Sequence, residues 1–409
     1  MRKWLAATAG LLVLLSGCTG SSPADEDACE EYLRETLVAP FNTEGECRLV
    51  PRVDAAIGHV GIGFDRLGEA GETGYLVDLT TGSSTPIEMP EDAVFAKAHS
   101  TRIDDQPVLL VTGYRKAPGA DYRPFALGFD PSGEPVLRAE ADWTTPTVVP
   151  EMRVTSTNVW DQKGVLDIAA KKWTRTDRSL DHTTVEPYRR LQTTPVAMFG
   201  GNLVLTVSGD ALVTGESRTV QVVGLFAVTP ANAVVWQTLD RTGPGSGDRT
   251  AVAGYLGAYV LQLTGPDTGP WQIAWYDGET GRPTDPKPAD LAGLRGGTAG
   301  LVTPGQLIAT DDGRYLALAT PDTPTNLTAV IDVEAGTVTP ITTPSTTSVS
   351  AMTNTTAYLS PQHGKKSSVD LASGEQQDLS DDTKLPDLVT DEAALFAVHL
   401  HDKTMVVTR

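Results

Sequence analysis

Cysteine, aromatic side chains and positive charge are all scarce in this sequence. Three of 409 residues are cysteine, 6% are aromatic, and 32 basic residues face 52 acidic ones, which gives a net charge of −20 at pH 7. Such a surface repels phosphate backbones and anionic lipid headgroups, so the composition excludes nucleic-acid binding. After the first 15 residues, no run is apolar enough to span a bilayer.

The sequence also lacks the common catalytic signatures. It contains no Gly-x-Ser-x-Gly, no His-Glu-x-x-His, no Cys-x-x-Cys and no phosphate-binding loop motif. No residue therefore stands out as catalytic, and we expect no catalytic residue, no metal ligand and no cofactor-binding residue.

Hydrophobic residues and turn formers, in contrast, are abundant. A hydrophobic fraction of 40% excludes a disordered chain. The 39 glycines and 28 prolines are typical of a protein with many turns.

The N-terminus carries a secretion signal. Arg2 and Lys3 precede an apolar stretch, residues 4–15, which is too short for a membrane-spanning helix. The sequence then reads Leu15-Ser16-Gly17-Cys18, which resembles the lipobox of bacterial lipoproteins. The resemblance implies a signal peptide over residues 1–17, lipidation of Cys18 and anchoring at the extracytoplasmic face of the cell membrane. An ordinary signal peptide with a chance cysteine is the alternative.

The two remaining cysteines form an even pair in an oxidising compartment. Cys29, Leu33 and Leu37 have helical spacing, and Pro40 would stop the helix. We therefore expect residues 18–50 to contain a lipidated tether and a short helix, joined by a Cys29–Cys47 disulfide to a strand at 48–53. Reactive thiols are the alternative, although nothing basic surrounds Cys29.

A repeated unit begins soon after Pro51. Short apolar or β-branched runs bounded by turn residues indicate strands, at 55–63, 108–113, 203–207, 220–228, 259–263, 315–319 and 395–399. Several runs lead into Asp-x-x-x-Gly or a degenerate form of it, anchored at Asp78, Asp130, Val228, Asp277, Asp332 and Asp370. The aspartate accepts backbone hydrogen bonds across a hairpin turn, and the glycine takes a positive φ.

The anchor spacing predicts the architecture. The intervals are 52, 98, 49, 55 and 38 residues, and Asp177 lies near the middle of the double interval. Seven units of about 49 residues predict an all-β fold, a β-propeller of seven blades over residues 51–409, with eight blades as an alternative. A β-sandwich or barrel is the competing fold.

One unit resembles a known family. Residues 224–236, from Gly224 to Trp236, are similar to the repeat of quinoprotein-type (PQQ-like) β-propellers, in which the tryptophan docks between neighbouring blades. Family members serve as cofactor-dependent dehydrogenases, protein-binding scaffolds or sensors. The dehydrogenases have eight tryptophan-docked blades, a calcium site and a catalytic aspartate, which this sequence does not match. This mismatch predicts a chain without cofactors. Together with the lipobox, the repeat and the missing catalytic motifs, it favours a non-catalytic binding role.

Four smaller groups of residues could be read as sites, and we favour a structural explanation for each. We expect an exposed strand face for His399, His401 and Asp402, and solvated turns for the pairs Asp177 with Asp181, Asp311 with Asp312, and Asp381 with Asp382. We expect packing between blades for Trp271, Trp275 and Tyr276, and close backbone packing for Gly58, Gly61 and Gly63.

The sequence thus predicts a membrane-anchored propeller that binds an envelope protein or ligand. A glycan hydrolase or lyase with carboxylates facing the channel is the rival hypothesis. We also expect the last strand runs, 395–400 and 405–408, to join the sheet that holds Tyr75–Leu79, because the residues after Gly374 are too few for another blade.

Overall fold

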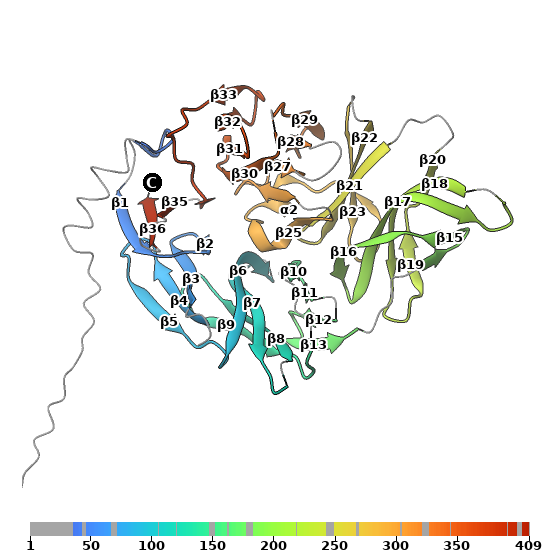
Figure 1. Ribbon diagram of the computed structural model, residues 1–409, viewed down its shortest axis with the longest axis horizontal. Helices are drawn as coiled ribbons and strands as arrows, with labels where there is room; N and C mark the ends of the chain where they lie inside the picture. The colour runs from blue at the N-terminus through green and yellow to red at the C-terminus, as the bar shows by residue number, and fades with distance from the viewer. Residues whose placement is uncertain are drawn as a thin grey trace, which may run out of the picture.

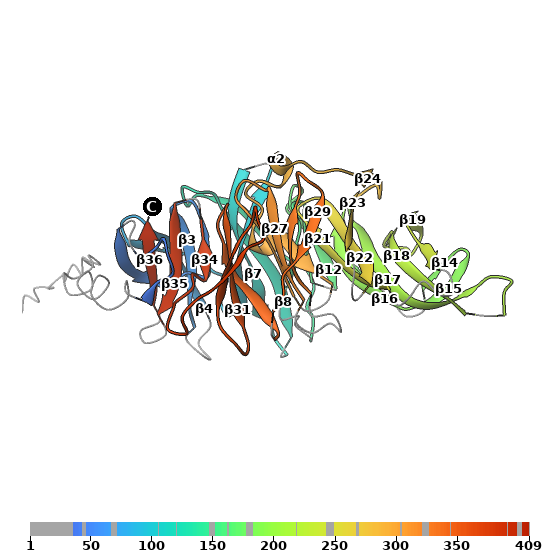
Figure 2. The same cartoon turned by 90° about the horizontal axis from the view of Figure 1, so that it is seen from above.

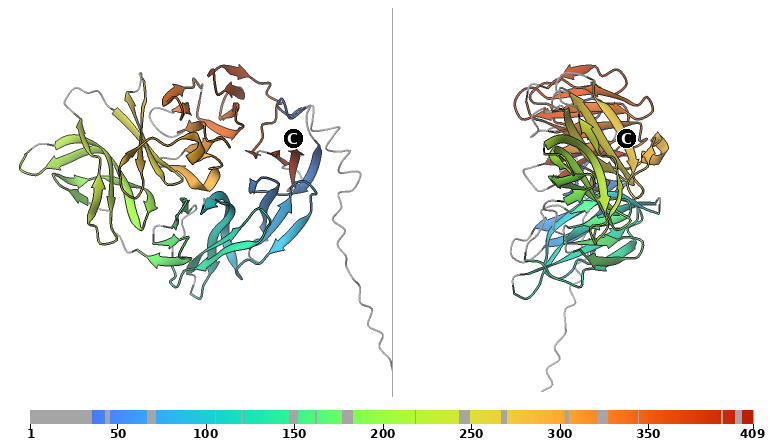
Figure 3. Two further views of the ribbon diagram at one scale, coloured as in Figure 1. Left: turned by 180° about the vertical axis from the view of Figure 1, so that it is seen from behind. Right: turned by 90° about the vertical axis from the view of Figure 1, so that its right-hand side faces the viewer.

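Eight antiparallel sheets follow one another around a ring in the computed structural model (Figures 1 and 3). The structure describes residues 36–42, 46–66, 72–104, 106–119, 121–146, 152–161, 163–176, 183–217, 219–242, 249–266, 270–302, 305–320, 327–343, 345–390, 392–398 and 403–408. Cys18, Cys29, Asp177, Asp181, His399, His401 and Asp402 lie outside these ranges, as do residues 1–17.

The first four sheets, numbered along the chain, contain strands β2 to β20. Sheet 1 comprises β2 (Ala55–Ile57), β3 (Val60–Arg66), β4 (Glu72–Asp78) and β5 (Ser84–Ile87). Sheet 2 comprises β6 (Ala93–Ile103), β7 (Gln106–Lys116), β8 (Tyr122–Phe129) and β9 (Pro135–Glu140). Sheet 3 comprises β10 (Arg153–Val154), β11 (Asn158–Trp160), β12 (Gly164–Asp167) and β13 (Lys172–Arg175). Sheet 4 comprises β14 (Thr183–Val185), β15 (Tyr188–Leu191), β16 (Thr193–Phe199), β17 (Asn202–Val213), β18 (Thr219–Val228), β19 (Val234–Gln237) and β20 (Asp240–Thr242).

The next three sheets complete the continuous part of the ring. Sheet 5 comprises β21 (Arg249–Leu256), β22 (Tyr259–Pro266), β23 (Gln272–Asp277), β24 (Pro283–Thr284) and β25 (Ala299–Leu301). Sheet 6 comprises β26 (Gln306–Ala309), β27 (Tyr315–Ala319), β28 (Thr328–Asp332) and β29 (Thr337–Pro340). Sheet 7 comprises β30 (Thr347–Met352), β31 (Thr356–Pro361), β32 (Ser367–Asp370) and β33 (Gln376–Asp378).

Sheet 8 is built from both ends of the described chain. It comprises β34 (Leu388–Val389), β35 (Ala393–Val398), β36 (Lys403–Thr408) and β1 (Cys47–Pro51), and β1 pairs antiparallel with β36 from Cys47 opposite Val407 to Pro51 opposite Lys403. The predicted all-β propeller is therefore confirmed. Seven sheets each come from a single stretch of chain, in agreement with the seven predicted units. The eighth sheet, which no repeat anchor marked, closes the ring.

Closure by both chain ends is as predicted, but the partner strand is not. The last strands pair with β1 and not with β4, which holds Tyr75 and Val77. The residues after Gly374 suffice for the closing sheet because β1 supplies its fourth strand. The ring therefore begins at Cys47 and not at residue 51. Sheet 1 is the neighbour of sheet 8, where Tyr75 and Val77 pack against Leu395 and Val406.

The core is divided among the interfaces between sheets. Eight clusters of buried apolar side chains each join two consecutive sheets, and the cluster around Val50, Val77 and Val406 joins sheet 8 to sheet 1. Strands near the middle of a sheet are covered on both faces, so β27 is buried at every position. An outer strand such as β33 is exposed at every position.

The predicted turn chemistry is present in the hairpins between third and fourth strands. In sheet 2, the Asp130 carboxylate accepts hydrogen bonds from the Ser132 amide and hydroxyl at 2.8 and 2.6 Å, and these bonds lower the pKa of Asp130. Gly133 closes the turn with a φ of 86°. In sheet 3 the turn runs from Asp167, which accepts the Ala170 amide, to Lys171 at a φ of 52°, so this hairpin uses Asp167 and not Asp177.

The last part of the segment before the ring, residues 36–42, does not continue the predicted helix. Leu37, expected on the apolar face of that helix, forms an isolated bridge with Lys384. Phe41 packs against Tyr358 and Phe396, with ring centroids 6.1 and 5.9 Å apart. These contacts fix the segment onto sheets 7 and 8, because burial of its apolar side chains outweighs continuation of a short helix.

Replacing Val406 with aspartate should open the ring. Val406 is fully buried in the cluster between sheets 8 and 1. An unpaired charge there should lower the free energy of unfolding by about 3–5 kcal/mol. Chemical denaturation measures the change, and Val234→Asp on the exposed edge of sheet 4 is the control. Equal stability of the two variants would show that the ring does not depend on this closure.

Candidate functional site

A strap crosses one face of the ring. It comprises residues 285–298, between β24 and β25, and contains the short helix α2 (Pro288–Leu291) and the 3-10 turn η3 (Gly296–Thr298). Figure 2 shows α2 standing at one face of the ring. The turns between the first and second strands of sheets 1, 2, 3, 5, 6 and 8 lie beside the strap, and we call this side of the ring the first-turn face.

Both apolar and polar contacts hold the strap in place. Leu291 and Leu294 are buried in the cluster between sheets 5 and 6. The Gly293 amide donates to the Asp311 carbonyl oxygen at 2.8 Å, and the Arg295 Nε lies 2.5 Å from the Asp311 Oδ1. On the other side, Arg102 from the end of β6 donates to the Ala292 carbonyl oxygen. The strap therefore links sheet 5 to sheets 6 and 2.

The inner end of the strap fills the space beside the innermost strands. The turn η3 contacts β6, β10 and β25, which belong to three different sheets. Gly297 lies so close to His99 that a Cβ on the glycine would sit 2.2 Å from the His99 Cβ. Only glycine fits there, and η3 in turn covers the imidazole.

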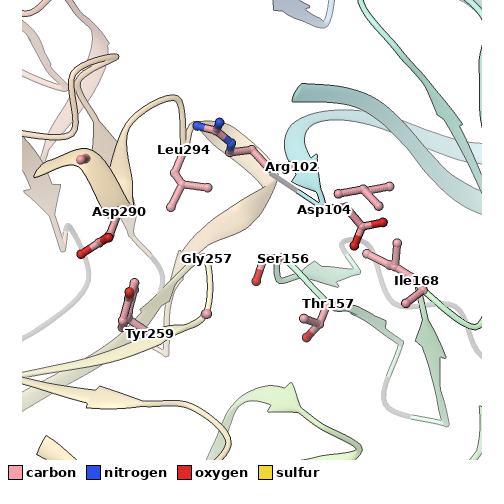
Figure 4. A pocket seen from close by; sticks show the side chains of 13 residues that line it. Arg102, Asp104, Ser156, Thr157, Ile168, Gly257, Tyr259, Asp290 and Leu294 are labelled. Carbon is pink, nitrogen blue, oxygen red and sulfur yellow. The ribbon is translucent and has the colours of Figure 1, made fainter. Parts of the chain in front are cut away.

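Cavity A lies on one side of the strap and has a volume of about 540 Å³ (Figure 4). First turns of sheets 2, 3 and 5 supply Asp104, Thr157 and Tyr259, and the strap supplies Asp290. Asp290 and Tyr259 lie on one side of the cavity in Figure 4, and Asp104 and Thr157 lie on the other. Burial, together with the negative charges of Asp290 and Asp277, raises the pKa of Tyr259.

Cavity B lies on the other side of the strap and has a volume of about 500 Å³. Four of its charged or titratable side chains come in two pairs, Arg295 with Asp311 and His59 with Glu392, the second with 3.7 Å between Nδ1 and Oε2. Apolar side chains line the rest, namely Ala56, Ile57, Pro107, Pro131 and Ala292. Arg102 borders both cavities.

Two of the three aspartate pairs considered as calcium ligands lie in the described residues, and each has another structural role or an exposed position. The Asp312 carboxylate accepts the Thr310 hydroxyl at 2.6 Å and the Arg314 amide at 3.0 Å, as in a solvated turn. Asp381 and Asp382 lie exposed in the turn after β33. Within the described ranges, no three His, Cys, Asp or Glu side chains gather as a metal site would require.

The aromatic group is confirmed as packing between blades. Trp271 and Trp275 are buried in the cluster between sheets 5 and 6, and Tyr276 packs against the cluster between sheets 4 and 5. Trp236 of sheet 4 docks on the hairpin of sheet 5, where its indole N–H donates to the Glu279 carbonyl oxygen at 3.1 Å. A Cβ on Gly281 would sit 2.2 Å from that indole.

Two of the three glycines near the start of the ring, Gly61 and Gly63, pack closely, as predicted. A Cβ on Gly63 would sit 1.8 Å from the Arg52 carbonyl oxygen, and one on Gly61 would sit 2.7 Å from a Val53 methyl group. Gly58 lies at a φ of 54° in the turn between β2 and β3, beside cavity B. The predicted strand over 55–63 is therefore a hairpin.

The sequence did not point to the strap or, apart from Gly58 and Asp311, to the residues that line the two cavities. Arg102, Asp104 and Asp290 belong to no motif. The available signal was length, because the strap lies within the 55-residue interval from Asp277 to Asp332, which exceeds the mean unit of about 49 residues. That excess indicated an insertion in this unit, though not where it would lie.

Comparison with known proteins adds little to this geometry. The sequence matches no protein-family model and no curated protein. Similar solved structures include BamB from Moraxella catarrhalis, 12% identical over 88% of this chain and 96% of that chain, with a TM-score of 0.40. An oligogalacturonate lyase in complex with manganese is 10% identical over 88% and 90%, with a TM-score of 0.37.

A third similar structure is the β-propeller domain of the Trilobed protease from Pyrococcus furiosus. It is 9% identical over 82% of this chain and 99% of that chain, with a TM-score of 0.34. At such scores these likenesses carry no argument about function. The propeller fold of this chain rests on its own sheet order and on the eight core clusters. No helix among the described residues is long and apolar enough to cross a membrane.

His99 predicts a pH dependence of stability. Burial, aided by the charge of Lys97, lowers the pKa of His99 to about 4, and its Nε2 lies 3.0 Å from the Thr112 hydroxyl. Between pH 6.5 and 4 the unfolded chain binds a proton that the folded chain does not, so stability falls as the pH falls. The loss should be about 1.4 kcal/mol per pH unit, and about 3 kcal/mol in total.

Denaturation curves at pH 4 to 8 for the wild type and His99→Gln test this dependence. Because the other titrating groups are shared, the difference between the two curves isolates His99. The wild type should lose stability relative to the variant on acidification. Parallel curves would contradict a buried neutral imidazole.

Proposed function

We propose that this chain is a lipid-anchored, extracytoplasmic binding module that recognises an envelope protein through its first-turn face. The observation that carries the proposal is the pair of cavities on that face. Their linings draw side chains from sheets 1, 2, 3, 5, 6 and 8 and from the strap. Concave sites lined by several elements with a few polar groups are typical of binding sites.

A glycan hydrolase or lyase remains the second candidate, because Asp104 and Asp290 line the same cavity. Paired carboxylates are the usual machinery of glycoside hydrolysis, in which a general acid has a raised pKa. Burial raises the pKa of Asp161 to about 6. Asp161 lies in the turn between β11 and β12, held by the Lys163 and Gly164 amides, and lines neither cavity.

Chemical crosslinking in intact membranes tests the binding function. We expect one envelope protein to crosslink to the wild type and to be lost with Thr157→Trp, which fills cavity A from an exposed position. Thr337→Trp, on the exposed outer strand of sheet 6, should keep the crosslink. Turnover of a cell-wall glycan by the purified wild type, without a specific crosslinked protein, would favour the enzyme instead.

The membrane anchor is proposed to be acyl chains on Cys18. Two or three such chains hold a protein stably at a membrane, whereas one chain does not. Cys18→Ala should therefore move the protein from the membrane fraction to the medium, as measured by fractionation and immunoblotting. Sedimentation of the variant with membranes would show that another surface anchors the protein.

The N-terminal segment is proposed to be fixed by a disulfide between Cys29 and Cys47. Cys47 begins β1, so this bond would tie the N-terminal segment to the closing sheet. With Cys18 lipidated, Cys29 is the remaining thiol. Alkylation followed by mass spectrometry should label neither cysteine before reduction and both afterwards. Labelling of either thiol in the native mature protein would refute the pairing.

A further inference from the structure

The geometry points to one bipartite site in which cavities A and B receive an extended polypeptide segment of the partner, with a basic side chain in A and an apolar side chain in B. The inference rests on the proposed function and deepens it. Both cavities open at the first-turn face, they share Arg102, and the strap forms the wall between them. Ala289, Asp290 and Leu294 face A, and Ala292, Gly293 and Arg295 face B.

Cavity A has the chemistry for a basic side chain. Asp104 and Asp290 place carboxylates on the two sides of the cavity, and Ser156 and Thr157 add hydroxyl oxygens to its lining (Figure 4). One oxygen of Asp290, Oδ2, accepts the Lys287 amide at 2.7 Å, which leaves Oδ1 and the Asp104 carboxylate for a basic group. The cation that borders the cavity, Arg102, is directed toward the strap and donates to the Ala292 carbonyl oxygen. The net charge of −20 would also attract a basic segment.

Cavity B has the chemistry for an apolar side chain. Its charged and titratable groups have partners, since Arg295 lies beside Asp311, His59 lies beside Glu392, and Arg102 donates to the Ala292 carbonyl oxygen. Ser100 is buried there, and its hydroxyl donates to the Ala56 carbonyl oxygen at 2.9 Å. An incoming ligand therefore meets mainly the apolar side chains of Ile57 and the two prolines that line the cavity.

A polypeptide suits this pair of cavities better than a glycan does. Sugar rings commonly stack on exposed Phe, Tyr or Trp side chains, and Tyr259 is the one such side chain in the described linings of A and B. An extended peptide projects side chains i and i+2 to the same side, about 7 Å apart. Alternate side chains could thus enter cavities on the two sides of one narrow strap.

Labelled octapeptides of glycine and serine test the site on the full-length protein in detergent micelles. The probes carry Lys and Leu two or four positions apart, and matched probes carry Glu for Lys or Ser for Leu. Fluorescence anisotropy should show at least tenfold tighter binding of a Lys–Leu peptide than of either matched peptide. Asp104→Asn with Asp290→Asn should abolish the preference for Lys over Glu and keep the preference for Leu.

Substitution on the other side of the strap should give the reverse pattern. Ile57→Asp should abolish the preference for Leu and keep the preference for Lys. Asp382→Asn, which removes the same charge from an exposed turn outside both cavities, should change neither. Equal affinity for the Lys and Glu probes, or no binding of any probe, would overturn the bipartite peptide site.

The two proposals fail in distinguishable ways. If a partner crosslinks at the first-turn face while the peptides show no selectivity, the bipartite site is wrong and the binding function stands. If cell-wall oligosaccharides bind to the purified protein and compete with the peptides, a glycan site replaces the peptide site. If selective peptide binding occurs without a crosslinked partner, the site stands and the envelope protein is the wrong partner class.

Discussion

The antiparallel pairing of β1 with β36 is the interaction on which the rest of the ring depends. It joins Cys47 to Val407, so strands from the two ends of the described chain share one sheet. Each of the other sheets forms from a single stretch of chain. Without this pairing, the faces of sheets 1 and 7 that meet sheet 8 would be exposed, and with them apolar side chains such as Val77 and Tyr358. Closure therefore removes open edges and buries two interfaces at once.

The candidate site follows from that constraint. A closed ring gathers the first turns of its sheets around one mouth, and sheet 8 contributes Thr390 and Glu392 to cavity B. The strap then divides the mouth, because Leu291 and Leu294 fix it to sheets 5 and 6 while Arg102 holds it from sheet 2. The two cavities are thus features of the whole ring and of one insertion, and neither could form on an isolated sheet.

The aspartate and glycine turns made the fold predictable from the sequence. Departures from that turn pattern explain why sheet 8 was not marked and why the wrong aspartate was chosen in sheet 3. Each of the six anchors, five of them aspartates, marks a hairpin between the third and fourth strands of a sheet. The double interval between two anchors indicated the seventh sheet. Sheet 8 has no such hairpin, since β36 ends at Thr408 and its neighbour β1 comes from the other end. In sheet 3, Lys171 takes the place of glycine, which hid Asp167. The site was not predictable, because Arg102 and Asp290 come to line the same cavity only through long-range packing of the strap.

Hydrogen–deuterium exchange of the native protein tests ring closure most directly. If β1 and β36 hold the ring, the amides that hydrogen-bond between these two strands should exchange only with global unfolding, as slowly as the amides of the central strand β27 and with the same dependence on denaturant. Faster exchange of these hydrogen-bonded amides through a separate local opening, with β27 still protected, would contradict the account.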